Sequence, residues 1–86
     1  MDPYIVIKYP LSTEKSIRLM EAENKLVFVV NKKATKSDVK NAIQEIYKVK
    51  VTDVKTLVTS QGEKRAYVRF SPETPAVDIA TQLGLI

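Results

Sequence analysis

The chain has 86 residues, which is enough for a single domain over residues 1–86 but not for a second domain or a deep substrate cavity. It carries 14 lysine and arginine residues against 10 aspartate and glutamate residues, and the formal charge of +4 favours a polyanionic partner. Cysteine and histidine are both absent, which excludes disulfides, thiolate metal sites and the usual general base near neutral pH.

The first third of the chain predicts two strands with a helix between them. Tyr4–Ile7 is a short apolar run and is expected to form a strand at the edge of a sheet. Ser12 or Thr13 opens a helix that ends near Glu23. The run Leu26–Val30 is apolar on both faces of a strand, which is typical of a central strand covered on both sides.

The clearest element in the sequence is a helix that begins after Thr35 and continues to Tyr47. Apolar residues recur along it at helical spacing, at Val39, Ala42, Ile43, Ile46 and Tyr47. Thr35 is expected to be the N-cap, and Asp38 three residues later completes a capping-box pattern.

The next segment predicts a hairpin. One strand over Val49–Val58 loses its alternation near Thr52–Asp53, where we expect a bulge. The loop Thr59–Glu63 then leads into a second strand, Lys64–Phe70, whose alternate residues face opposite sides of the sheet.

A last short helix is predicted after Pro72. Thr74 is expected to be its N-cap with Pro75 at the first helical position, and Gly84 is the expected left-handed residue at its end. The element order is therefore strand, helix, strand, helix, strand, strand, helix. This order predicts an α+β fold in which helices pack on a four-stranded, mainly antiparallel sheet.

Catalysis finds little support in this sequence. The carboxylates are spread among lysines rather than clustered, no nucleophile has a base beside it, and two glycines cannot form a phosphate-binding loop. We therefore expect that the chain is not an enzyme and that it binds neither a metal nor another cofactor. No apolar run could span a bilayer and no signal-peptide pattern is present, so we expect a cytoplasmic protein without membrane insertion.

Basic residues gather in two places that could bind the phosphates of a nucleic acid. They precede the central helix at Lys32, Lys33 and Lys36, and they lie on the hairpin at Lys55, Lys64, Arg65 and Arg69. Tyr67 lies between the two arginines on one strand face and could stack on a base. The alternative is an ordinary solvated surface on which Tyr67 only covers the sheet.

The segment Ala66–Phe70 also matches the second half of the RNA-recognition-motif signature. The first half is missing, because Glu63, Lys64 and Arg65 stand where a basic residue, a glycine and an aromatic residue are required. A recognition-motif-like module is therefore an alternative.

Five segments together resemble the family of ribosomal protein twenty-three of the large subunit, the universal protein at the nascent-chain exit. They follow one another in the family's order and spacing, and they are Pro10–Lys15, Asn24–Val30, Ala34–Lys36, Val49–Leu57 and Lys64–Val68. The loop Thr59–Glu63 is shorter than in bacterial members, and the ending Asp78–Ile86 is similar to archaeal and eukaryotic members. The resemblance thus implies an archaeal-type protein.

The resemblance also implies partners and site residues. The partners are the third domain of the large-subunit ribosomal RNA, ribosomal protein twenty-nine of the large subunit, and signal recognition particle and nascent-chain chaperones that dock at the exit tunnel. Glu14, which by local physics complements a helix dipole, would belong to the docking platform. Thr35, Lys36, Lys55 and Thr56 fall on the RNA side.

A rival interpretation is a small protein-interaction module with no role in RNA binding. It is favoured by the modest net charge and by the mixture of acidic and basic residues along the chain.

Overall fold

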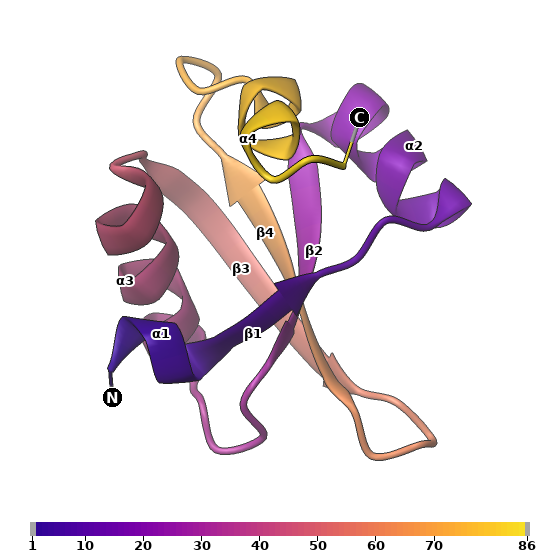
Figure 1. Cartoon of the computed structure of the whole chain (residues 1–86), viewed down its shortest axis with the longest axis vertical. Helices are drawn as coiled ribbons and strands as arrows, with labels where there is room; N and C mark the ends of the chain where they lie inside the picture. The colour runs from indigo at the N-terminus through magenta and orange to yellow at the C-terminus, as the bar shows by residue number, and fades with distance from the viewer. Residues whose placement is uncertain (1, 86) are drawn as a thin grey trace.

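The computed structural model describes residues 2–85, in which four helices pack on a four-stranded sheet (Figure 1). The elements in chain order are α1 (Pro3–Val6), β1 (Ile7–Pro10), α2 (Glu14–Glu23), β2 (Lys25–Val30), α3 (Lys36–Tyr47), β3 (Val51–Val58), β4 (Lys64–Phe70) and α4 (Ala76–Gln82). The α+β class and the antiparallel sheet predicted from the sequence are confirmed. Among the described residues, no helix is long and apolar enough to cross a bilayer.

The strands lie in the order β1-β2-β4-β3, and every neighbouring pair is antiparallel. β2 therefore lies inside the sheet, as its continuous apolar run predicted, and β1 and β3 form the edges. The bulge expected near Thr52–Asp53 is present as a register shift between Val51 and Asp53. The loop joining β3 to β4 spans residues 59–63, as predicted.

One face of the sheet forms the hydrophobic core with the helices. The cross-strand row Leu26, Val68 and Val54 is buried on this face. Each helix contributes to the same cluster, with Val6 from α1, Met20 from α2, Ile43 from α3 and Ile79 from α4. The alternate strand residues point to the opposite face. On β2 these are Val27 and Val29, which are buried as well, so this strand is covered on both sides as predicted, whereas those of β3 and β4 are mainly charged.

Local hydrogen bonds begin the two longer helices where the sequence predicted. Thr35 Oγ1 accepts the backbone N–H of Asp38 at 3.1 Å, and the carboxylate of Asp38 accepts the N–H of Thr35 at 3.0 Å. Thr13 and Ser16 exchange the same pair of bonds at the start of α2. These capping boxes depend only on residues three apart, so the sequence is sufficient to place them.

The strand predicted over Tyr4–Ile7 is wrong for all but its last residue. Asp2 accepts the N–H of Tyr4 at 2.9 Å and Pro3 occupies the first turn, so a short helix forms first. β1 begins only at Ile7. The helical turn allows Val6 to be fully buried where α1 packs against α3 (Figure 1).

The start of the last helix also differs from the prediction. Pro75, rather than Thr74, is the N-cap residue of α4, and its side chain cannot accept a hydrogen bond from the first turn. The cap comes from Asn24 instead, whose Oδ1 accepts the N–H of Ala76 at 2.6 Å. Gly84 has the expected left-handed backbone (φ 73°), and its neighbour Leu85 packs against the core. The other residue expected to pack there, Ile86, lies outside the described residues.

Candidate nucleic-acid interface

The strand β4 places Arg65, Tyr67 and Arg69 on the face of the sheet opposite the hydrophobic core. The intervening residues Ala66 and Val68 are buried in the core, so the predicted alternation is confirmed. We call the surface formed by Lys55, Leu57, Arg65, Tyr67, Arg69 and Tyr9 the open face.

Cross-strand register brings further residues into this face. Lys55 on β3 lies directly opposite Tyr67, and Leu57 lies opposite Arg65. The family resemblance placed Thr56 on the RNA side together with Lys55, but Thr56 pairs with Ala66 and so points to the helix-covered face. The structure therefore separates Thr56 from Lys55 because consecutive residues in a strand point to opposite sides.

Arg65 is held in place by an acidic neighbour. Its Nε donates to Glu63 Oε1 at 2.8 Å, and the other carboxylate oxygen, Oε2, accepts the hydroxyl of Tyr9 at 3.1 Å. The bond from Arg65 lowers the pKa of the Glu63 carboxyl, and the bond to Glu63 raises the pKa of Tyr9. Glu63 thus orients Arg65 on the open face by accepting a hydrogen bond from the Nε of this arginine.

The other lysines predicted to bind RNA, Lys32, Lys33, Lys36 and Lys64, lie at one end of the sheet. The connection from β2 to α3 and the loop from β3 to β4 lie at this end, at the bottom of Figure 1. The Nζ of Lys32 lies over Gly62 in the hairpin loop, 3.3 Å from the position that a Cβ there would occupy. We call this surface the basic end, and it consists of Lys32, Lys33, Thr35, Lys36 and Lys64.

Lys64 differs from the other lysines of the basic end because its ammonium group is already bound. Its Nζ donates to the backbone carbonyl of Ala34 at 2.6 Å, which ties the hairpin to the segment before α3. Lys64 and Arg65 are both half-buried, which leaves less of each side chain accessible to RNA than in a fully exposed residue. Lys32, Lys33 and Lys36 are exposed.

The hydroxyl of Thr35 is also engaged within the protein, since it caps α3. The carboxylate of Asp38 lies at the same helix terminus, and the backbone N–H of Thr35 that it accepts lowers its pKa. An anion at this terminus would meet a negative charge already in place. The basic end can therefore attract phosphates through its lysines but not through the helix dipole.

Glu14, the residue predicted to dock protein factors, is the first residue of α2. Its side chain is 80% exposed and forms an ion pair with Arg18 at 2.6 Å, one turn along the helix. The first turn of α2 borders the open face, because Thr13 and Lys15 line a small cavity together with Arg65 and Tyr67.

Residues 5–78 match the family model described as ribosomal protein L23. The chain belongs to this family. Over 85 residues it is 49% identical to the large ribosomal subunit protein uL23 of Methanococcus aeolicus, and the alignment covers 99% of both chains. The resemblance to an archaeal-type member is thus confirmed, and membership of a ribosomal protein family confirms that the chain is not an enzyme.

Within the L23-family fold, the open face contains two exposed residues that the sequence did not single out. Tyr9 on β1 is 49% exposed and Leu57 on β3 is 45% exposed. They lie in one cross-strand row with Arg65, because Tyr9 pairs with Val29, Val29 with Arg65, and Arg65 with Leu57. Only the strand order and register could reveal this row.

Acidic side chains do not offer a metal site in the described part of the chain. Among residues 2–85, no group of three or more aspartates and glutamates is placed to hold a metal ion.

Proposed function

We propose that this chain is a structural protein of the large ribosomal subunit, ribosome-bound in the cytoplasm, and that it binds ribosomal RNA through the open face and the basic end. The observation that carries the proposal is that Lys55, Tyr67 and the two flanking arginines lie together on the sheet face opposite the hydrophobic core. The family match and the archaeal relative, a large ribosomal subunit protein, support it.

The chemistry of the open face suits RNA in two ways. Arginine and lysine contact phosphates whatever the base sequence and supply most of the affinity. Tyr67 is half-buried, so its ring is held against the sheet while one side can stack on a base or a ribose. Thr56 and Lys64 act within the protein in this proposal, and Thr35 acts as a helix cap.

The finer assignments follow from the family resemblance. We place the RNA site on the third domain of the large-subunit RNA, near the exit tunnel and beside ribosomal protein twenty-nine. Glu14 is exposed at the start of α2 and is our candidate contact for signal recognition particle and nascent-chain chaperones.

Salt dependence of binding tests the RNA-binding proposal. With about six phosphate contacts, affinity for purified third-domain RNA should fall about 10³-fold between about 50 and about 200 mM salt. Lys55→Ala should lower the slope of log affinity against log salt by about 0.9, because one phosphate contact is lost. Lys50→Ala is the matched control, since Lys50 is exposed but lies outside both surfaces.

Two outcomes would contradict the proposal. One is an affinity that does not change with salt, and the other is a protein that never sediments with large subunits. Either result would favour the rival module that binds only proteins.

A further inference from the structure

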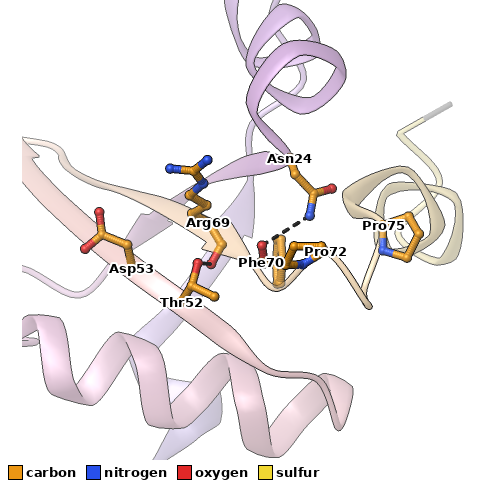
Figure 2. Close-up of a pocket in the computed structure, with 7 residues that line it drawn as sticks. All are labelled: Asn24, Thr52, Asp53, Arg69, Phe70, Pro72 and Pro75. Carbon is orange, nitrogen blue, oxygen red and sulfur yellow. Dashed lines mark hydrogen bonds between the residues drawn. The ribbon is translucent and has the colours of Figure 1, made fainter.

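A groove of about 510 Å³ opens at the end of the sheet opposite the basic end (Figure 2). Its volume lies in the range of about 300–1,000 Å³ that is usual for ligand sites. It is lined by Thr52, Asp53, Arg69, Phe70, Pro72 and Pro75, and Asn24 completes its wall. None of these residues except Arg69 was predicted to bind anything.

Hydrogen bonds hold the walls of the groove in place. Asn24 Nδ2 lies within hydrogen-bond distance of the carbonyls of Phe70, Ser71 and Thr74, and its Oδ1 accepts the N–H of Ala76. The bulged residue Thr52 donates its hydroxyl to the carbonyl of Arg69 at 3.2 Å. Because the backbone on both sides is fixed in this way, the groove exists before any ligand arrives.

Two charged side chains at the groove have no partner within residues 2–85. Asp53 and Arg69 lie opposite each other on β3 and β4, and both are exposed. Figure 2 shows both side chains rising from the same side of the hairpin. Neither forms an ion pair or a side-chain hydrogen bond with another described residue, so both charged groups remain available to a ligand.

We propose that this groove binds one unstacked guanine base of the RNA that crosses the open face. The proposal rests on the proposed function, because Arg69 belongs to both the groove and the open face. RNA-binding proteins read single-stranded bases by stacking on flat side chains and by hydrogen bonds to the Watson–Crick edge. Here the guanidinium of Arg69 supplies a flat surface, and the rings of Pro72 and Pro75 supply apolar contact beside it.

The carboxylate of Asp53 selects guanine among the four bases. Guanine is the base whose Watson–Crick edge presents two adjacent N–H donors, at N1 and N2, and a carboxylate can accept both. Adenine and cytosine each present one amino group beside an acceptor, and uracil presents one N–H between two acceptors. The unpaired acceptors of these three bases would face a negative charge.

Twelve-nucleotide RNAs test this site with the full chain. One is all uridine, and three others carry a single central guanosine, adenosine or cytidine; affinities are measured by fluorescence anisotropy at low salt. The guanosine RNA should bind at least about fivefold tighter than the others, the lower end of a good two-bond base contact. Addition of the RNA with the central guanosine should also shift the amide NMR signals of Thr52 and Asp53.

Asp53→Asn should abolish the guanosine preference while leaving binding to the all-uridine RNA at least as strong, because the variant removes a negative charge. Glu73→Gln is the matched control. It makes the same change in charge on the loop that carries Pro72, outside the groove lining, and should keep the preference.

The outcomes separate this site from the proposed function. Salt-dependent binding of every RNA without a guanosine preference, or a preference that survives in Asp53→Asn, overturns the guanine site alone. A groove that takes a side chain of a neighbouring protein instead would give this result. Failure of all four RNAs and of ribosomal RNA to bind overturns the proposed function itself.

Discussion

Replacing Lys64 by methionine tests whether this lysine fastens the fold or binds RNA. Methionine keeps an unbranched stem of similar length but removes the ammonium that donates to the Ala34 carbonyl at 2.6 Å. Ala34 is buried, with 1% of its surface exposed, so its carbonyl would lose a donor that water cannot readily replace.

The expected loss follows from the strength of a charge-assisted hydrogen bond. Such bonds contribute about 1.5–3 kcal/mol, and we expect about 1–2 kcal/mol here because water reaches the half-buried ammonium. For a domain of this size the melting temperature should fall by roughly 5–15 °C. Urea unfolding followed by circular dichroism measures the free energy of unfolding, and a thermal scan measures the shift.

Lys36→Met is the matched control because Lys36 is exposed at the first position of α3. It should leave the melting temperature nearly unchanged and reduce the salt slope of RNA binding by about 0.9. Lys64→Met should do the reverse, lowering stability while the slope stays the same. A stable Lys64→Met protein whose slope falls by about 0.9 would refute this reasoning and return Lys64 to the RNA contacts.

Three further changes test other features. Glu14→Ala should weaken docking of signal recognition particle to assembled subunits but leave RNA affinity and melting temperature nearly unchanged, because the exposed pair with Arg18 adds little stability. Asn24→Gly retains the left-handed backbone (φ 57°) but removes the side chain that bonds to four backbone groups, so urea unfolding should show a loss of about 2–4 kcal/mol. The pKa of Glu63 is lowered in the folded protein, so its stabilising contribution is present above its ordinary value of 4.5 and is lost as the pH falls through the lowered folded value. Melting temperatures across this acidic window should therefore fall less in Glu63→Gln than in the unchanged chain.

Each of these outcomes can fail in a distinct way. Reduced RNA binding by Glu14→Ala would mean that the residue serves the start of α2 rather than a docking factor. An Asn24→Gly protein as stable as the parent would show that the loop before α4 holds its shape without this cap. If the melting temperature of Glu63→Gln fell with pH in the same way as that of the unchanged chain, the bond between Glu63 and Arg65 would not be a source of stability.

The sequence by itself determined the elements whose causes lie within a few residues. The helix α3 is set by apolar residues three and four apart and by the exchange of bonds between Thr35 and Asp38. The alternation along β4 likewise placed Arg65, Tyr67 and Arg69 on one face. In both cases the backbone period fixes which side chains share a side, so no distant partner is needed.

Only the tertiary structure decided which of these side chains are free to bind a ligand. Lys64 bonds to a carbonyl 30 residues away, and Asn24 caps a helix 52 residues away. The apolar run Tyr4–Ile7 fits either a strand or a helical turn. The helical turn is the form in which Val6 is buried, at the contact between α1 and α3. Hydrogen-bond partners and burial depend on strand order and register, which bring together residues that the sequence keeps far apart.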